Sequence, residues 1–184
     1  MTMSMSRLRL GRLLPVVVAL LLAPAAAPAQ DVSLPTLKAA FLANFAKFTE
    51  WPQDAQPPGR VLTFCVIGDK AVAAALEQGI KDRPGQEPMS VANVTADAPL
   101  RGCQVLYLGG MNLRDARRVL ETVKGLPIFT VSDVDGFAEH GGVAQLRLER
   151  GRMRFAINPA AAQRARLSLS AKLLSLATIV KDTQ

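Results

Sequence analysis

The sequence predicts an α/β fold: a mostly parallel central sheet flanked by helices, with a C-terminal antiparallel hairpin and a closing helix. Two observations lead to this fold class. First, short and nearly continuous apolar runs alternate with segments of helical periodicity, which is typical of βαβ units with buried strands. Second, the pattern changes after residue 142. Two stretches that alternate apolar and polar residues are separated only by Arg150-Gly151, as in a hairpin with one buried face.

The first 29 residues have the pattern of an export signal. Three arginines precede a nearly wholly apolar run at 13–22, and Ala27-Pro28-Ala29 supplies small residues of the kind that signal peptidase reads. About ten apolar residues are too few to span a bilayer of roughly 30 Å. We therefore expect a signal peptide at 1–29, cleaved near Ala29, a single domain at 30–184, and a periplasmic location.

The mature chain opens with an aromatic helix. Residues 41–52 hold four of the nine aromatic residues of the chain. Ser33 is the expected N-cap, and Trp51-Pro52 is expected to end the helix, because a residue before proline avoids the α region. The apolar residues fall on one helical face, which predicts a core stripe, with an aromatic groove for a ligand or partner helix as the alternative. This stripe consists of Leu34, Leu37, Phe41, Phe45 and Phe48.

The remaining elements follow from periodicity and turn residues. Strands are predicted at 61–67, 89–94, 105–108 and 127–131, and helices at 70–78 and from the Asn112 cap to Val123. The hairpin strands are predicted at 143–149 and 152–158, and a helical stretch begins at Pro159. A last helix is expected over 168–180, with one apolar side made of Leu169, Leu173, Leu176 and Val180.

Charge limits the class of partner. Removing residues 1–29 takes away three arginines and no acidic residue, so the formal net charge falls from +7 to +4. The cations are scattered and are not interleaved with aromatic residues, which argues against nucleic-acid binding. The basic surface suits an acidic protein partner or anionic lipid headgroups, or it only keeps the protein soluble.

Cys65 and Cys103 are the two cysteines of the chain. In an oxidising compartment an even number favours a disulfide, with two independent buried thiols as the alternative. If the strands that end at Gly68 and Gly109 were level parallel neighbours, the sulfurs would lie roughly 10 Å out of step. A bond therefore requires a staggered register, or Cys103 in a loop that bends back.

The strand ends offer one candidate ligand crevice. In open α/β sheets, ligands tend to bind at the carboxyl ends of the strands, where backbone N–H groups could hold an anion and carboxylates could accept from a hydroxyl or amine. Asp135 follows close behind. Glycine and aspartate are also ordinary turn residues, and that alternative stays open. The crevice residues are Gly68, Asp69, Gly109, Gly110 and Asp133.

No motif predicts catalysis, a cofactor or a metal site. His140 is the only histidine, and without grouped ligands it is expected to be a surface residue. Ser168 and Ser170 are interpreted as cap and first-turn residues of the last helix. The sequence contains no nucleophile elbow, no phosphate-binding loop and no cysteine–histidine pair in a recognisable context. We therefore expect a protein that is not an enzyme.

Several segments, in order, resemble the YfiR family. The opening helix 41–52 resembles that of the family, and 152–158 and 167–177 resemble its closing segment. Between them, four short pieces follow in the family's order. The resemblance extends over nearly all of residues 34–180. The intervening pieces are 64–68, 103–109, 130–133 and 136–142.

The resemblance implies a non-catalytic periplasmic repressor. It would bind the periplasmic sensor domain of an inner-membrane diguanylate cyclase, hold the enzyme off, and so lower cyclic-di-GMP and biofilm formation. An outer-membrane lipoprotein and a second copy of the chain are further expected partners. The alternative function is a small-molecule-binding module that feeds a sensor kinase.

The resemblance also assigns residues. It implies that Cys65 and Cys103 pair, whereas a second cysteine pair of the family has no counterpart in 135–149. Ala156 stands where an acidic residue is common, and Arg166 where glycine is common, which affects the identity of the partner.

The hairpin and the following helix are the expected partner surface, because they combine cations with apolar and amide groups near a sheet edge. An ordinary solvated hairpin face is the alternative. The residues assigned to this surface are Phe137, Arg152, Arg154, Asn158 and Arg166.

Overall fold

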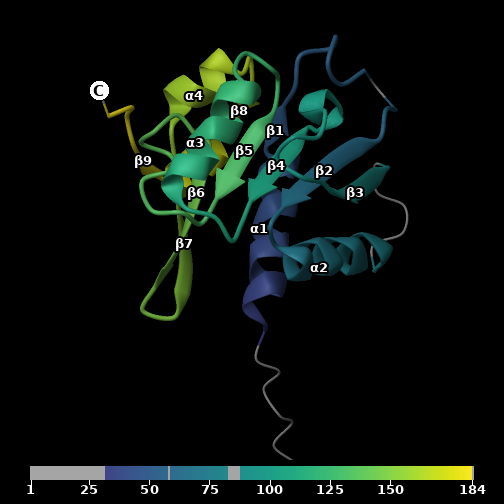
Figure 1. The fold of residues 1–184 in the computed structure, drawn as a ribbon, viewed down its shortest axis with the longest axis horizontal. Coiled ribbons are helices and arrows are strands. Elements are labelled where there is room, and N and C mark those ends of the chain that lie inside the picture. The colour runs from purple at the N-terminus through teal and green to yellow at the C-terminus, as the bar shows by residue number, and fades with distance from the viewer. Residues whose placement is uncertain (1–31, 58, 83–87, 184) are drawn as a thin grey trace, which may run out of the picture. The chain divides into compact units, whose positions relative to one another are not determined.

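The computed structural model describes residues 32–57, 59–82 and 88–183. The predicted signal peptide lies outside the described residues. Figure 1 shows a central sheet with helices on both faces, as the sequence predicts. Its seven strands have the order β3-β2-β4-β5-β6-β7-β9, and only the β6–β7 pair is antiparallel. They are β2 (Leu62–Ile67), β3 (Met89–Asn93), β4 (Val105–Leu108), β5 (Phe129–Ser132), β6 (Ala144–Glu149), β7 (Arg152–Ile157) and β9 (Thr178–Ile179).

Helices cover the sheet in two layers. Helices α1 (Leu34–Lys47) and α2 (Lys70–Lys81) pack with one face of the strands in the larger core cluster. Helix α3 (Leu113–Thr122) and a short 3-10 turn at Leu100–Gly102 pack on the opposite face. The strand sequence sorts side chains between the two layers. On β2, for example, Phe64 and Val66 belong to the first layer, and Cys65 and Ile67 to the second.

Helix α1 differs from the prediction in its end and in its buried face. Ser33 caps it as expected, but it ends at Lys47, before Trp51-Pro52. The next two residues form β1 (Thr49–Glu50), which pairs with the distant strand β8 (Ser168–Leu169). The fully buried face runs through Lys38, Leu42 and Phe45. Of the predicted stripe only Phe45 lies on this buried face, while Phe41 stands at its edge and meets Phe155 of β7 at 5.9 Å between ring centroids.

The closing segment is not one helix. After α4 (Pro159–Arg164), residues 168–180 divide into β8, the short helix α5 (Ala171–Leu176) and β9. Ser170 caps α5, whereas Ser168 belongs to β8. Of the four residues predicted for the apolar side only Leu173 is buried, and Leu176 is 67% exposed. Pairing with β1 and β7 satisfies the backbone of β8 and β9, and this tertiary pairing overrides local helix propensity.

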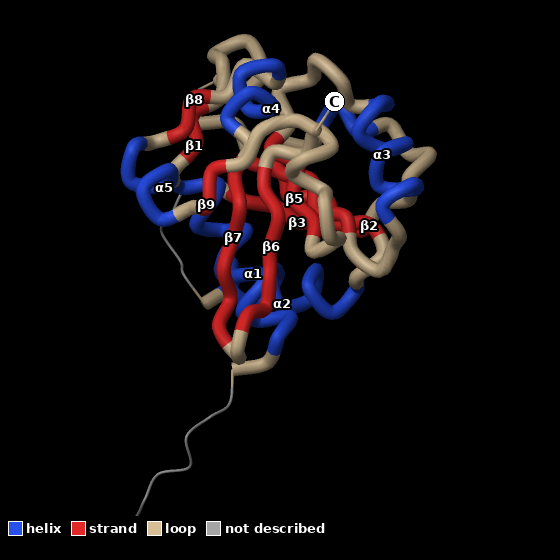
Figure 2. The backbone as a smooth tube through the Cα atoms, turned by 90° about the vertical axis from the view of Figure 1, so that its left-hand side faces the viewer, coloured by secondary structure: helices blue, strands red, loops and turns tan. Residues whose placement is uncertain are grey.

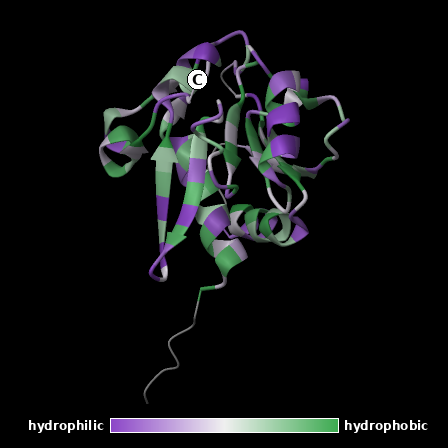
Figure 3. Ribbon diagram, turned by 60° about the vertical axis from the view of Figure 1, so that its left-hand side comes forward, coloured by the Kyte–Doolittle hydropathy of each residue, from purple (hydrophilic) through white to green (hydrophobic). Residues whose placement is uncertain are grey.

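The β6–β7 hairpin agrees with the sequence. Arg150 and Gly151 have positive φ angles of 50° and 75°, as a two-residue type I′ turn requires. The two strands are in register from Ala144↔Ile157 to Glu149↔Arg152. Figure 3 shows the alternation of hydrophilic and hydrophobic residues along them.

Candidate functional site

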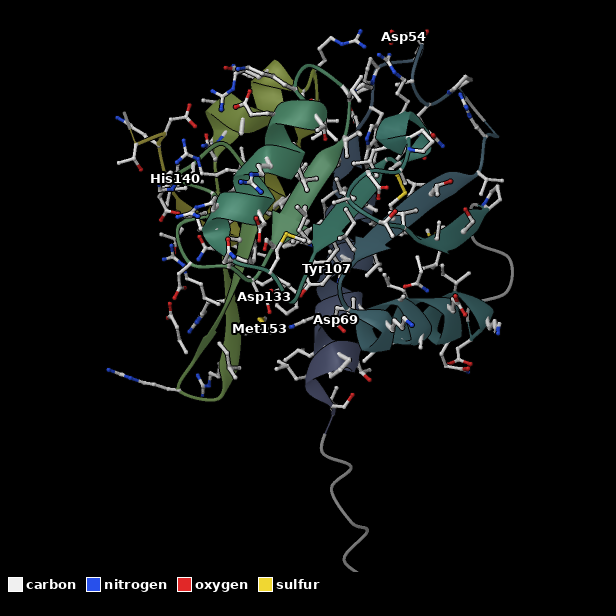
Figure 4. All side chains as sticks on the ribbon, viewed as in Figure 1. Asp54, Asp69, Tyr107, Asp133, His140 and Met153 are labelled. Carbon is white, nitrogen blue, oxygen red and sulfur yellow. A yellow bond between two sulfur atoms is a disulfide. The ribbon has the colours of Figure 1, made fainter. Side chains whose placement is uncertain are left out.

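A charged cluster lies at the carboxyl ends of the parallel strands. The register places Ile67, Leu108 and Ser132 level with one another, so the residues that follow them meet at one edge of the sheet. The Nζ atom of Lys38, from α1, lies 2.7 Å from a carboxylate oxygen of Asp133 and 3.6 Å from one of Asp69. Figure 4 shows Asp69 and Asp133 at this end of the sheet. One buried lysine thus joins the first helix to two strand ends.

Tyr107 forms the floor of this cluster. Its side chain is completely buried, and the Lys38 ammonium lies 5.7 Å from the centre of its ring. Burial raises the pKa of the Tyr107 phenol, and the negative charges of Asp133 and Asp69 raise it further. Tyr107 therefore stays neutral, and the formal charge of the cluster comes from one lysine and two aspartates. Sequence reasoning missed both Lys38 and Tyr107, because neither belongs to a motif.

The three glycines of the predicted crevice lie against one another. The chain passes from β2 outward to β3 and returns to β4 on the other side of β2, so the strand order reverses between β2 and β4. At this point the backbones pack directly together. A methyl group on Gly68 would collide with the carbonyl oxygen of Gly109, and one on Gly110 would lie 2.8 Å from that of Gly68. The five predicted residues do come together, but the glycines close the crevice.

An open groove lies beside the cluster instead. It has a volume of about 430 Å³ and runs between the first turn of α1 and the β6–β7 hairpin. Its lining combines charged residues, among them Lys38, Asp133 and Asp135, with apolar residues of α1 and the hairpin. Two of the apolar residues, Leu34 and Leu148, are 42% and 57% exposed, so this part of the lining is open to solvent. Figure 4 labels Met153 of the hairpin and Asp133, which both line this groove.

The structure separates the predicted partner residues into exposed and buried groups. Arg152, Arg154 and Arg166 are exposed. Phe137 and Asn158 have no exposed surface, so they cannot contact a partner in this conformation. Partner binding through the three arginines stays a prediction.

Each of the two buried residues has a local structural role. The ring of Phe137 lies under Gly142, where a methyl group would collide with it. The Asn158 amide donates to the carbonyl of Ala138 and to the Asp182 carboxylate, and its oxygen caps α4. These contacts hold the loop before the hairpin against the segment after it. The sequence gives the type of each of these side chains, but it does not show which backbone groups they contact in the folded protein.

Arg166 occupies a position that favours glycine. It follows the C-terminal cap of α4 with a φ angle of 56°, in the left-handed region. Glycine, which the resemblance leads us to expect at this position, adopts this region without strain. The Arg166 guanidinium donates to Asp54 at 3.0 Å, on the part of the protein opposite the strand-end cluster. Arg166 therefore does not join Arg152 and Arg154 in one patch around the turn of the hairpin.

Cys65 and Cys103 form a disulfide, with a Cα–Cα distance of 5.7 Å. The neighbouring strands β2 and β4 are level at Gly68 and Gly109, and Cys65 pairs with Leu106. Cys103 reaches Cys65 because it lies before β4, directly after the 3-10 turn. The bond thus forms through a loop that bends back, one of the two arrangements that the sequence allowed.

A second cavity, of about 330 Å³, lies between α3, α4 and the last residues of the chain. His140 lines it and is half-buried, with Nδ1 2.7 Å from the carbonyl oxygen of Gly136, so it is not the surface histidine expected. Arg164 and Asp182 form an ion pair at its rim. Within the described ranges, no three His, Cys, Asp or Glu side chains gather as a metal site requires. None of the helices described there is long and apolar enough to cross a bilayer.

Comparison with known proteins adds two findings. The sequence profile of the YfiR/HmsC-like family matches residues 35–178. A solved structure of a conserved domain protein from Vibrio cholerae O1 biovar El Tor strain N16961 is similar in fold, with a TM-score of 0.54 at 12% sequence identity. The alignment covers 83% of this chain, which spans 61% of the length of that protein. At this level of identity the second likeness shows the fold alone.

Proposed function

Because this chain belongs to the YfiR/HmsC-like family, we propose that it is a non-catalytic periplasmic regulator of cyclic-di-GMP signalling. The observation that carries this proposal is the family match over residues 35–178. The export signal predicted at 1–29 supports the location. A regulator of this kind needs only different affinities for two states of its partner, and it needs no catalytic group.

The proposed partner is the periplasmic sensor domain of an inner-membrane diguanylate cyclase, which the protein holds in its inactive state. The hairpin supports this proposal because Arg152 and Arg154 are exposed on an element that projects from the sheet. Cations at such a surface select an acidic partner and accelerate encounter. An outer-membrane lipoprotein that sequesters the repressor, and a second copy of the chain, are further proposed partners.

A genetic experiment tests the proposal. Deletion of the gene should raise cellular cyclic-di-GMP and biofilm formation, and the wild-type protein should restore both. Complementation with the double variant Arg152→Glu/Arg154→Glu should fail although the protein accumulates normally. The matched control is Arg114→Glu/Arg118→Glu on α3, which should complement. Unchanged cyclic-di-GMP after deletion, in every growth condition tried, would contradict the proposal.

The groove beside the strand-end cluster favours a second function, the binding of a small molecule that reports to a sensor kinase. Its volume of about 430 Å³ and its combination of charged and apolar walls are typical of small-ligand sites. Thermal-shift screening of the mature protein with periplasmic metabolites tests this function. A ligand of the groove should lose its effect in Asp135→Asn and keep it in the distant Asp54→Asn. A flat panel would count against a ligand-binding role.

A further inference from the structure

The turn-proximal half of the β6–β7 hairpin extends beyond its neighbours in the sheet. Strand β5 pairs only with Ala144 and Gln145 of β6, and β9 pairs only with Ala156 and Ile157 of β7. Within the part of the chain that the structure describes, residues 146–155 therefore form an arm whose two outer edges carry no strand. Figure 2 shows β6 and β7 continuing past the rest of the sheet.

The outer edge of β7 presents unpaired backbone groups. Asn158 donates its N–H to the carbonyl of Val143, just before β6, and the Ile157 carbonyl accepts from the N–H of Val180, just after β9. Inward and outward groups alternate along an antiparallel strand. The N–H and C=O groups of Met153 and Phe155 therefore point away from β6. The parallel pair Ala156↔Thr178 uses the Phe155 carbonyl for β9, so the Phe155 N–H and both groups of Met153 remain open at the edge. These three groups are hydrogen-bonding positions that an added strand can use.

The two faces of the arm have different chemistry along this edge. Phe155 packs on Phe41 of α1, and Met153 on the same face lines the groove. The opposite face carries Arg152 and Arg154, both exposed. A strand added to this edge would therefore place alternate side chains beside an apolar face and beside two cations.

Arg154 faces a residue of like charge in the hairpin, and no ion pair with a described residue compensates this repulsion. It lies directly opposite Arg147 in the hairpin, and like charges in this position destabilise a strand pair. Arg147 is neutralised by Glu139, whose carboxylate oxygen lies 2.7 Å away. Within the described residues Arg154 forms no ion pair. The arm thus keeps a repulsive cation next to an open edge, which fits an acidic side chain from another molecule.

We propose that the outer edge of β7, residues 152–155, binds an extended segment of a protein partner as an added β-strand. The segment alternates apolar residues, which lie beside Met153 and Phe155, with acidic residues, which lie beside Arg152 and Arg154. This inference rests on the proposed function and names the way in which the membrane partner is held. A second copy of the chain suits the edge poorly, because it would place the same arginines against one another.

A peptide experiment tests the binding chemistry without the natural partner. The probe is a blocked seven-residue peptide of alternating valine and glutamate, titrated into the ¹⁵N-labelled mature protein and followed by NMR. Saturable shifts are expected at the amides of Met153 and Phe155, together with slower hydrogen exchange of both. The matched lysine peptide, and a peptide N-methylated at the valines, should bind at least tenfold more weakly. Absence of saturable shifts at these two amides would overturn the proposal.

Two proline variants test the edge in the full mature chain. The residue pair Met153 and Leu148 is directly opposed in the hairpin, and both N–H groups face outward, Met153 to the β7 edge and Leu148 to the β6 edge. Met153→Pro should abolish peptide binding, and Leu148→Pro should preserve it within about twofold, since proline is tolerated on an edge strand. Circular dichroism and the amide spectrum of the sheet establish that both variants fold. If Met153→Pro does not fold, Arg154→Glu replaces it as the test variant, and its affinity for the valine–glutamate peptide should be at least tenfold lower than that of the wild type. Equal binding by the folded variants would overturn the proposal.

The same variants separate this inference from the proposed function. If the protein binds the cyclase sensor domain and Met153→Pro binds it equally well, strand addition is overturned while repression stands. If deletion leaves cyclic-di-GMP unchanged but the acidic peptide slows hydrogen exchange at the amides of Met153 and Phe155, the strand-binding site is supported and regulation of the cyclase is rejected. Analytical ultracentrifugation tests whether a second copy of the chain binds this edge. A dimer of the wild-type chain that Met153→Pro dissociates would assign the edge to a second copy and overturn the proposal.

Discussion

Lys38 joins three elements through one side chain, because it reaches from α1 to Asp69 after β2 and Asp133 after β5. Its side chain is only 11% exposed, so the charge is tolerated through these partners and the Tyr107 ring. The arrangement explains how a helix whose stripe looks wholly apolar in sequence can bury a lysine. Lys38 also lines the groove beside the hairpin and contributes a positive charge to its lining.

Replacement of Lys38 by methionine should destabilise the protein. The variant keeps the apolar stem and leaves two carboxylates without their cation, and we expect a loss of about 1–3 kcal/mol in the free energy of unfolding, less than for a fully buried pair. Urea denaturation measures it. Lys47→Met, exposed in the last turn of the same helix, is the control and should change stability by about 0.5 kcal/mol or less. Equal effects of the two variants would contradict a role for the ion pairs.

The Arg164–Asp182 pair predicts a pH dependence. Hydrogen bonds from Arg164 lower the pKa of Asp182 below its usual 3.8, burial opposes this shift, and a hydrogen bond from Asn158 adds to it. A carboxylate with a lowered folded-state pKa stabilises the fold above the unfolded pKa, and this contribution is lost as pH falls through the folded value. The melting temperatures of wild type and Asp182→Asn should therefore differ by a constant amount from pH 5 to 7, and the difference should narrow progressively as the pH falls below about 4. A difference that does not narrow in acid would contradict the assignment.

The close packing of the strand ends at the reversal of strand order requires glycine at position 68, whereas helix α2 does not require the glycine at position 79. Gly68 has a φ angle of 78° and touches the backbone of Gly109, while Gly79 lies in α2 with open space where a Cβ would stand. Gly68→Ala should therefore lower the free energy of unfolding by about 2 kcal/mol or more, through strain and collision. Gly79→Ala should raise it by about 0.5–1 kcal/mol, through helix propensity. Chemical denaturation of both variants tests the pair, and a stable Gly68→Ala protein would show that the strand ends can separate.

The disulfide ties β2 to the loop before β4. Closing a segment of 38 residues should stabilise the fold by about 2–4 kcal/mol in the chain-entropy description. We expect reductant to lower the melting temperature of the wild-type protein and to leave that of Cys65→Ala/Cys103→Ala unchanged. Thiol labelling should find both cysteines only after reduction. Labelling of the untreated, folded protein would contradict the bond.

At the scale of the molecule, the basic surface predicts salt-dependent association. Without the predicted signal peptide, the chain would have a formal charge of +4, and the arm carries part of it. Stopped-flow measurement with the proposed partner, the sensor domain of a diguanylate cyclase, should show an association rate that falls about tenfold between 50 and 500 mM salt. The variant Arg152→Glu/Arg154→Glu should associate slowly at every salt concentration. A wild-type rate that does not depend on salt would exclude electrostatic steering by the arm.

The sequence by itself determined the parts that local pattern encodes. The buried runs predicted β2, β4 and β5 to within about two residues, and the alternating pattern with its two-residue turn predicted the β6–β7 hairpin. The order of short segments identified the family, which the profile match over residues 35–178 confirmed. These features could be predicted because periodicity and turn chemistry act within a few residues of one another.

Only the tertiary structure decided what lies beside each element. It rotated the aromatic stripe of α1 toward the hairpin, divided the predicted last helix between two distant strand partners, and buried Phe137 and Asn158. It also closed the glycine crevice and opened a groove against the hairpin instead. The physical reason is the same in each case. Whether a polar or apolar group is buried, paired or free depends on segments outside its own helix or strand, and local periodicity carries no information about them.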